Sequence, residues 1–160
     1  MKKPRLYVAY GSNLNKRQMS YRCPGAKVIT TGIIENYKLV YRGSRTGAYA
    51  TIIPYEGESV QVAIWQINKT HEIALDRYEG FPSFYYKKKI FVKAFNGYKF
   101  EAMVYIMRDD ALPGEPSSYY LNVCAEGYLD MGLDMTKFEE SIIYNKEETS
   151  DICPYLRSIC

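Results

Sequence analysis

The chain has 160 residues, a net charge of +3, 17 tyrosines and a single histidine, and its length is typical of one domain. One histidine excludes a three-histidine zinc site and a two-histidine facial triad. It also leaves His71 as the only imidazole base for a serine or cysteine nucleophile. If the protein is an enzyme, carboxylates, tyrosines and backbone amides must do most of its chemistry.

Cysteine usage and hydropathy set expectations about the compartment. The cysteines Cys23, Cys124, Cys153 and Cys160 have no C-x-x-C spacing, so we expect free thiols in a reducing cytoplasm and no bound metal. No stretch approaches the roughly 18 apolar residues of a membrane span. The apolar run after the basic N-terminus is too short for a signal peptide. We therefore expect a cytoplasmic protein with no membrane partner.

Positive charge gathers in residues 1–45 and negative charge in residues 109–151. Such asymmetry can indicate nucleic-acid binding. The basic segment lacks the interleaved aromatics of RNA-binding modules, however, and a pI of about 8.5 is below the value expected for them. We therefore expect no nucleic-acid partner, and attribute the asymmetry to attraction between the two ends or to an anionic substrate.

The predicted strands come first along the chain. We expect a buried strand over residues 6–10, one or two strands over 28–41, and a hairpin of 49–53 with 60–67 around Glu56-Gly57-Glu58. Residues 86–95 and 98–107 flank Asn96-Gly97, which predicts a type I′ hairpin turn. The lysines 87–89 are expected to be solvated at a strand edge.

The longer predicted helices come late. Asn15 is expected to cap a short helix to about Arg22, Thr70 to open a helix that ends at Gly80, and Ser117 to cap one that ends at Gly132. Thr136-x-x-Glu139 predicts the capping box of a last helix. His71 is expected to be exposed, and the tail after about residue 145 extended. The order favours a single α+β domain over 1–160, with a small closed or strongly curved sheet of about six strands.

Residues Tyr10 to Leu14 form the first segment that can carry chemistry. Glycine and small polar residues between a strand and a helix create a turn whose backbone N–H groups can bind a carboxylate or an oxyanion. An ordinary strand-to-helix turn uses the same residue types. Ser12 is a poor nucleophile candidate, because the G-x-S-x-G pattern is absent.

The second segment surrounds Glu79, at the end of the predicted helix. The helix dipole and a nearby apolar wall would raise the pKa of this carboxyl, which suits a general base at neutral pH. A solvent-facing glutamate paired with Arg77 is the alternative, and Asp76 is expected to form local hydrogen bonds or ion pairs. The phenols of Tyr85, Tyr86, Tyr119 and Tyr120 can bind a polar ligand while packing an apolar wall.

Four segments in order resemble the γ-glutamylcyclotransferase-like proteins: Tyr10-Gly11-Ser12-Asn13-Leu14, residues 47–65 with Trp65, Leu75-Asp76-x-x-Glu79-Gly80, and residues 116–133 with Tyr120. The resemblance covers about residues 5–135. It implies a small mixed β-barrel with peripheral helices and a pocket at one end. It implies no cofactor, and it allows a homodimer.

The resemblance also implies the reaction and its residues. A γ-glutamyl compound would cyclise to 5-oxoproline and release an amino acid or amine. Glu79 would be the acid/base residue, the Tyr10–Leu14 loop would bind the glutamyl group, and Tyr120 would line the pocket. A further pocket tyrosine matches Tyr86 in one alignment and Tyr85 in another. A protein that keeps this pocket but only binds a small carboxylated ligand is the alternative function.

Overall fold

The computed structural model describes residues 4–43 and 47–157, with side chains to residue 150. In chain order its elements are β1 (Arg5–Ala9), the 3-10 turn η1 (Ser12–Leu14), α1 (Lys16–Arg22), β2 (Lys27–Gly43), β3 (Tyr49–Ile67), α2 (Lys69–Glu79), β4 (Tyr85–Ala94), β5 (Lys99–Met107), β6 (Leu112–Pro113), α3 (Ser118–Met131) and α4 (Met135–Arg157).

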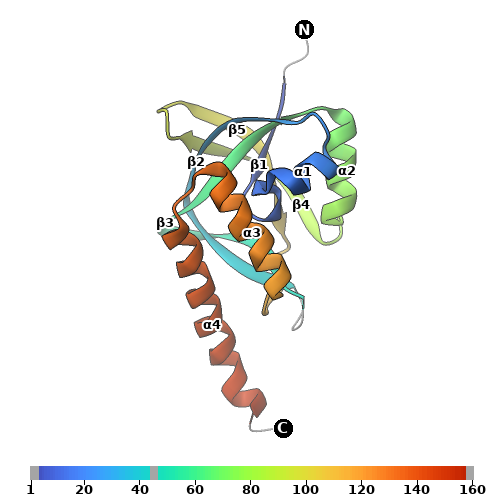
Figure 1. Ribbon diagram of the computed structural model, residues 1–160. Helices are drawn as coiled ribbons and strands as arrows, with labels where there is room; N and C mark the ends of the chain where they lie inside the picture. Colours follow the sequence, from blue (N-terminus) through green and yellow to red (C-terminus); the bar gives the residue numbers. More distant parts are fainter. Residues whose placement is uncertain (1–3, 44–46, 158–160) are drawn as a thin grey trace.

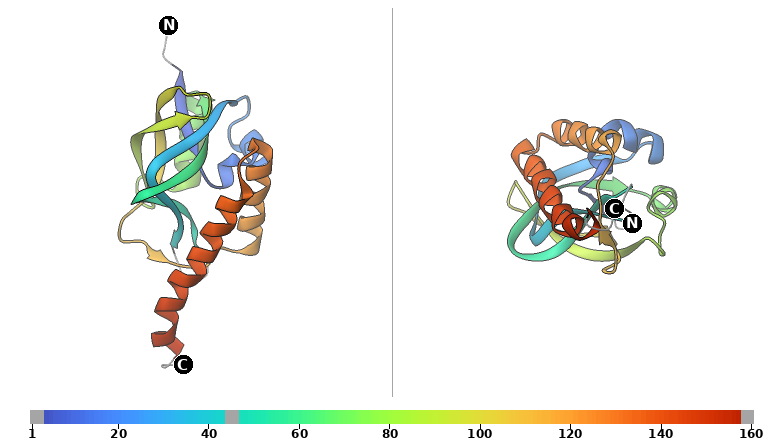
Figure 2. Two further views of the ribbon diagram at one scale, coloured as in Figure 1. Left: turned by 90° about the vertical axis from the view of Figure 1, so that its left-hand side faces the viewer. Right: turned by 90° about the horizontal axis from the view of Figure 1, so that it is seen from below.

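The strands form a closed mixed barrel, which confirms the predicted fold class. Their order is β3-β1-β5-β4-β2-β6, and pairing of β2 with β3 closes the ring. The β1–β5 pair is parallel, whereas the pairs β1–β3, β2–β3, β2–β4 and β4–β5 are antiparallel. The helices lie outside the barrel, with α3 and α4 on the same side (Figures 1 and 2).

The expected hairpin around Glu56-Gly57-Glu58 is wrong, because β3 is one strand of 19 residues whose two halves both pair with β2. Between Glu35 and Tyr37 of β2, the partner residues on β3 step from Ser59 to Pro54. Gly57 occupies this irregularity with a φ of 85°, and its N–H donates to Asn36 Oδ1. Gly57, expected from the sequence in a hairpin turn, therefore lies in a β-bulge.

The β4–β5 hairpin is confirmed, but its turn is not type I′. That turn needs positive φ at both central residues. Gly97 has a φ of 95°, whereas Asn96 is not among the described residues with positive φ. The Asn96 side chain instead accepts a hydrogen bond from the Tyr98 N–H. The expected lysine edge is confirmed in part: Lys88 and Lys89 are exposed, and β2 pairs with β4 only at Lys93 and Ala94. Lys87 differs from the expectation, because it is half-buried and contacts Asp76 at 2.9 Å.

Four predicted helix ends are confirmed. Asn15 caps α1 by accepting from the Gln18 N–H, Ser117 caps α3, and Gly132 ends α3 in the left-handed conformation. The helix α2 also ends at Gly80 as predicted, but it begins one residue before Thr70, with Asn68 as its cap.

His71 is buried rather than exposed, because it completes the cap of α2. Its N–H donates to Asn68 Oδ1, and its Nδ1 accepts from the Asn68 N–H. Its Nε2 lies 2.6 Å from the Pro24 carbonyl oxygen. The sole imidazole therefore joins α2 to the end of α1 and lies outside the pocket described below.

The last helix differs from expectation at both ends. Asp134, not Thr136, provides the side-chain oxygen that accepts the first-turn N–H, and the expected extended tail is helical to Arg157. Three contacts join α4 to β2: Lys38 Nζ lies 3.7 Å from the centre of the Tyr144 ring, Tyr41 Oη lies 2.8 Å from Ser141 Oγ, and Arg42 pairs with Glu148. The Arg42–Glu148 pair brings the basic segment 1–45 and the acidic segment 109–151 together. Over the described residues, no helix is long and apolar enough to cross a membrane.

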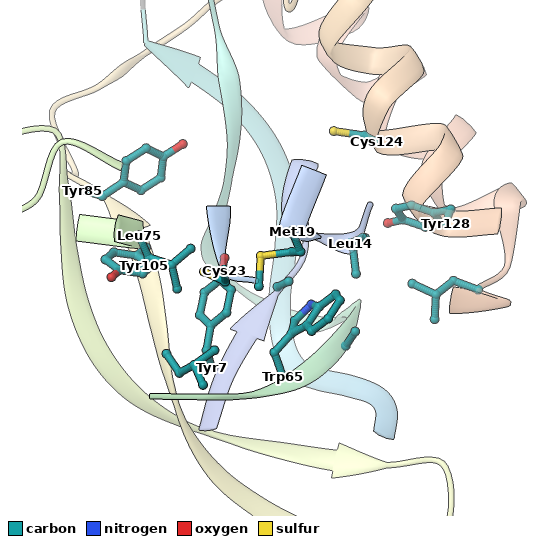
Figure 3. Close-up of a cluster of buried hydrophobic side chains, with 14 of the residues drawn as sticks. Tyr7, Leu14, Met19, Cys23, Trp65, Leu75, Tyr85, Tyr105, Cys124 and Tyr128 are labelled. Atoms are coloured by element: carbon teal, nitrogen blue, oxygen red, sulfur yellow. The ribbon is translucent and has the colours of Figure 1, made fainter. Parts of the chain in front are cut away.

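Two clusters of buried side chains support the barrel. One fills its interior from all of the five long strands. The other lies between the barrel and the helices α1, α2 and α3, and includes Tyr7, Met19, Cys23 and Trp65 (Figure 3). Cys23 and Cys124 are buried free thiols, as expected. The Cys153 side chain and Cys160 lie outside the described part.

Candidate active site

A pocket of about 340 Å³ lies where the loop after β1, the end of α2 and the first turns of α3 approach β3 and β4. Its lining includes most of the residues that the sequence singled out, although they come from four separate segments: Tyr10, Gly11, Ser12, Asn13, Glu79, Tyr85 and Tyr120. Tyr7, Tyr49, Tyr78, Phe84 and Tyr105 add further aromatic surface. The pocket is therefore an aromatic-walled cavity with a carboxyl on one side and a backbone loop on another.

Two predicted site residues lie outside this pocket. Leu14 is completely buried in the core, against Gly127 of α3. Tyr86 lines different surface clefts together with Arg108. Its neighbour Tyr85 points into the pocket, because successive strand residues face opposite sides. The structure thus places Tyr85, not Tyr86, at the candidate site.

The loop of residues 11–14 is held from several directions. The Leu14 N–H donates to the Gly11 carbonyl, and Trp65 Nε1 donates to the Asn13 carbonyl at 3.0 Å. Asn13 Nδ2 donates to Tyr7 Oη at 2.9 Å. A Cβ added at Gly11 would lie 3.1 Å from Tyr120 Oη. Because the loop is buried and tied on both sides, it presents a fixed surface to the pocket.

Tyr85 and Tyr120 share one backbone partner, Ala50 of β3. Tyr85 Oη donates to the Ala50 carbonyl at 2.8 Å, and the Ala50 N–H donates to Tyr120 Oη at 3.0 Å. Burial raises the pKa of both phenols well above their ordinary value. Both tyrosines therefore remain neutral hydrogen-bonding groups, with rings that form the pocket wall.

Glu79 is the last residue of α2 and faces the pocket. Burial raises the pKa of its carboxyl to about 7, and the charge of Arg22 opposes this rise. Burial is one of the two causes of a raised pKa that the sequence suggested, the helix dipole being the other, whereas the alternative of a solvent-facing pair with Arg77 is not what the structure shows. A carboxyl with a pKa near 7 can both accept and return a proton at neutral pH.

Sequence reasoning missed Arg22 and Tyr78. The Arg22 guanidinium carbon lies 3.5 Å from the centre of the Tyr78 ring, and Tyr78 Oη lies 3.1 Å from Ser12 Oγ. Fifty-odd residues separate the two partners along the chain, so no local pattern indicates the contact. Asp76 behaves as predicted, because it accepts from Tyr105 Oη and pairs with Lys87.

Comparisons with known proteins show what this chain is similar to. The family model "Gamma-glutamyl cyclotransferase, AIG2-like" matches residues 7–122. A curated gamma-glutamylcyclotransferase from Homo sapiens is 28% identical over 146 residues, which are 86% of this chain and 76% of that protein. The enzyme from Mus musculus is 31% identical over 137 residues, which are 80% and 72% of the two chains.

A solved structure of a gamma-glutamyl cyclotransferase superposes on this chain with a TM-score of 0.75 and 26% identity, covering 92% of this chain and 87% of that one. A human protein of solved structure gives the same TM-score at 27% identity, with 92% and 88% covered. The chain therefore belongs to the γ-glutamyl cyclotransferase, AIG2-like family of enzymes.

Proposed function

We propose that this protein cyclises γ-glutamyl amino acids or γ-glutamyl amines to 5-oxoproline and releases the amino acid or amine. One observation carries the proposal: Glu79, whose pKa is about 7, faces the same pocket as Gly11 and the buried loop residues Ser12 and Asn13. A single carboxyl of this kind suffices for a reaction in which the substrate supplies its own nucleophile.

The proton transfers balance around Glu79. Its carboxylate takes a proton from the substrate α-ammonium, and the freed amine attacks the γ-carbonyl carbon. A carbon–nitrogen bond forms, and the carbonyl oxygen becomes an oxyanion. The ring nitrogen then carries one surplus proton. When the carbonyl re-forms, the bond to the leaving nitrogen breaks and Glu79 returns the first proton to that nitrogen. The regenerated carboxylate takes the surplus proton from the ring nitrogen and passes it to the released amine, which leaves as an ammonium. General acid–base catalysis of this kind contributes roughly 10²–10⁴-fold.

The remaining pocket residues hold the substrate in the curled shape that ring closure requires. Backbone N–H groups of the loop at residues 11–13 would bind the glutamyl carboxylate or the oxyanion, and one oxyanion donor is worth about 10²–10³-fold. The rings of Tyr85 and Tyr120 would confine the methylene chain. Alignment of the amine with the carbonyl contributes on the order of several kcal/mol.

The test is 5-oxoproline release from a panel of γ-glutamyl dipeptides and γ-glutamyl amines, with Glu79→Gln compared against wild type. We expect the substitution to lower kcat by at least about 10²-fold. Glu72→Gln is the matched control, because Glu72 lies on the same helix and pairs with Arg5 outside the pocket. Equal turnover by wild type and Glu79→Gln would remove Glu79 from the mechanism. Ligand binding without turnover of any panel member would favour the non-catalytic binding function.

A further inference from the structure

Arg22 connects the Ser12–Asn13 loop of the candidate site to the end of α2, although it does not itself line the pocket. It is the last residue of α1 and is partly buried. Its Nη1 donates to Asn13 Oδ1 in the loop, and its Nη2 donates to Gln18 Oε1 at 2.7 Å. Its guanidinium also stacks on the ring of Tyr78, the residue before Glu79. One side chain therefore contacts both the loop and the helix end that carries the acid/base residue.

Tyr78 completes this connection. Its ring packs under Arg22, while its hydroxyl hydrogen-bonds to Ser12 Oγ. Asn13, the other end of the connection, is itself fixed through Tyr7 and Trp65. Because each partner of Arg22 is held by a second contact, a shift of the α2 end would break several contacts together.

We propose that Arg22 is a positioning residue that holds the end of α2, and so Glu79, against the Ser12–Asn13 loop, and that supplies a positive charge to Glu79. The role requires arginine rather than lysine. A planar guanidinium can donate along two directions while stacking on an aromatic ring, whereas an ammonium is a compact, strongly hydrated charge.

The other groups that face Glu79 are neutral, so the charge of Arg22 is the one that opposes the rise in the Glu79 pKa. Tyr7 and Tyr10 from β1 and its loop, Tyr85 from β4 and Tyr120 from α3 all interact with Glu79. Burial raises the pKa of each of these phenols well above its ordinary value, so they stay neutral at the pH where Glu79 titrates. Arg22 is the cation whose charge acts against the desolvation of Glu79.

The experiment separates the charge of Arg22 from its shape. We would measure the pH dependence of kcat/KM, and the titration of the Glu79 carboxyl by ¹³C NMR, identified by its loss in Glu79→Gln. We expect R22Q to raise the Glu79 midpoint by about 0.5–1 pH unit and to lower kcat by roughly tenfold or more. R22K should keep the midpoint within about 0.3 unit of wild type, since the charge remains, yet should lower kcat.

Arg17→Gln is the matched control. Arg17 lies on the same helix and forms an exposed pair with Glu126, so neither the midpoint nor kcat should change. Thermal melting of every variant reports any loss of stability. A purely structural role for Arg22 would lower the melting temperature but leave the Glu79 midpoint in place, and this result would overturn the proposal. Wild-type kcat in R22K would overturn the positioning part.

The catalytic readout rests on the proposed function, whereas the NMR titration does not. If wild type releases no 5-oxoproline from any panel member, the proposed function fails. The titration midpoint of Glu79 in R22Q still tests whether the charge of Arg22 lowers the Glu79 pKa. An unchanged midpoint in the folded R22Q protein would overturn the inference about Arg22 whichever substrate the enzyme uses.

Discussion

Tyr105 donates a 2.6 Å hydrogen bond to Asp76 Oδ1, and so joins β5 to α2 one turn before Glu79. Lys87 of β4 approaches the same carboxylate at 2.9 Å. The helix that carries Glu79 is thus tied to two barrel strands on one side and, through Tyr78, to the β1 loop on the other. The barrel therefore holds the candidate acid/base residue from both sides of its helix.

Tyr105→Phe removes the hydroxyl and keeps the ring that packs edge-on against Tyr7. A hydrogen bond to a charged group contributes about 1.5–3 kcal/mol. Because Lys87 still pairs with Asp76, we expect a loss at the lower end of this range, about 1.5–2 kcal/mol. Urea unfolding measures it. Tyr98→Phe is the control, since Tyr98 is exposed on the hairpin. Equal unfolding midpoints for wild type and Tyr105→Phe would contradict the role of this bond.

Glu79 should make the stability of the protein depend on pH. Burial raises the pKa of its carboxyl from 4.5 to about 7, so the folded state binds this proton more tightly than the unfolded state. The free energy of unfolding must then decrease as the pH rises from about 4.5 through 7. Above this range Glu79 is fully charged in the folded protein, and this buried charge lowers the free energy of unfolding. The Glu79→Gln substitution removes the charge and its cost.

We therefore expect Glu79→Gln to be more stable than wild type at pH 8, by on the order of 2 kcal/mol, and equally stable near pH 4. Chemical denaturation at several pH values tests this, with Glu72→Gln as the control from the exposed ion pair with Arg5. A constant difference between Glu79→Gln and wild type over pH 4–8 would show that burial does not raise the pKa. Activity should follow the opposite trend, because kcat/KM falls as Glu79 is protonated below about pH 7.

Local patterns predicted the parts of the site that lie close together in the sequence. The small residues of the loop after β1 and the position of Glu79 at a helix end are both visible from residue types. The choice between Tyr85 and Tyr86 was not, because alternation assigns them to opposite faces, but the packing of the helices decides which face lines the pocket. The β4–β5 register pairs Tyr85 with Met107 and Tyr86 with Ile106. Tyr85 and its partner Met107 belong to the cluster between the barrel and the helices.

The long-range contacts escaped prediction for a related reason. Arg22 and His71 are polar residues at ordinary helix positions, and each acquires its role from a partner on another segment: Tyr78 for Arg22 and Pro24 for His71. The long strand β3 was mistaken for a hairpin because Gly57 and its charged neighbours are typical of turns. Pairing with β2 outweighs that local preference.

Gly127 allows α3 to approach the loop at the candidate site. A Cβ at this position would lie 2.7 Å from the Asn15 nitrogen and 2.8 Å from the Leu14 carbonyl carbon. Both are backbone atoms, so the helix or the loop must move. We expect Gly127→Ala to destabilise the fold by about 1–3 kcal/mol and, because the loop shifts, to raise KM for γ-glutamyl substrates.

Gly132→Ala is the matched control for this prediction. Gly132 ends the same helix with a φ of 66°, and an added Cβ would meet nothing within 4 Å. Strain in the left-handed conformation should cost about 1 kcal/mol, while KM stays at the wild-type value. The comparison is made by thermal melting and steady-state kinetics. If both variants raise KM equally, the effect reflects general loss of stability and not the α3–loop contact.

Arg77 is the cation that lines the pocket itself, and it is exposed. The neighbouring Tyr49 and Phe84 are each about 40% exposed, so this side forms the pocket mouth. In the proposed reaction the glutamyl half places its amine and γ-carbonyl near Glu79, and the leaving group then extends toward the mouth. We therefore expect Arg77 to favour leaving groups that carry a carboxylate.

The matched substrates are γ-glutamyl-alanine and γ-glutamyl-ethylamine, which differ only by that carboxylate. Arg77→Gln should lower kcat/KM for the first by about three- to tenfold, the worth of one exposed charged hydrogen bond, and leave the second unchanged. The preference of wild type should also weaken as salt rises. An equal loss on both substrates would mean that Arg77 binds the glutamyl half. An unchanged kcat/KM for both substrates would mean that Arg77 does not interact with the carboxylate of the leaving group.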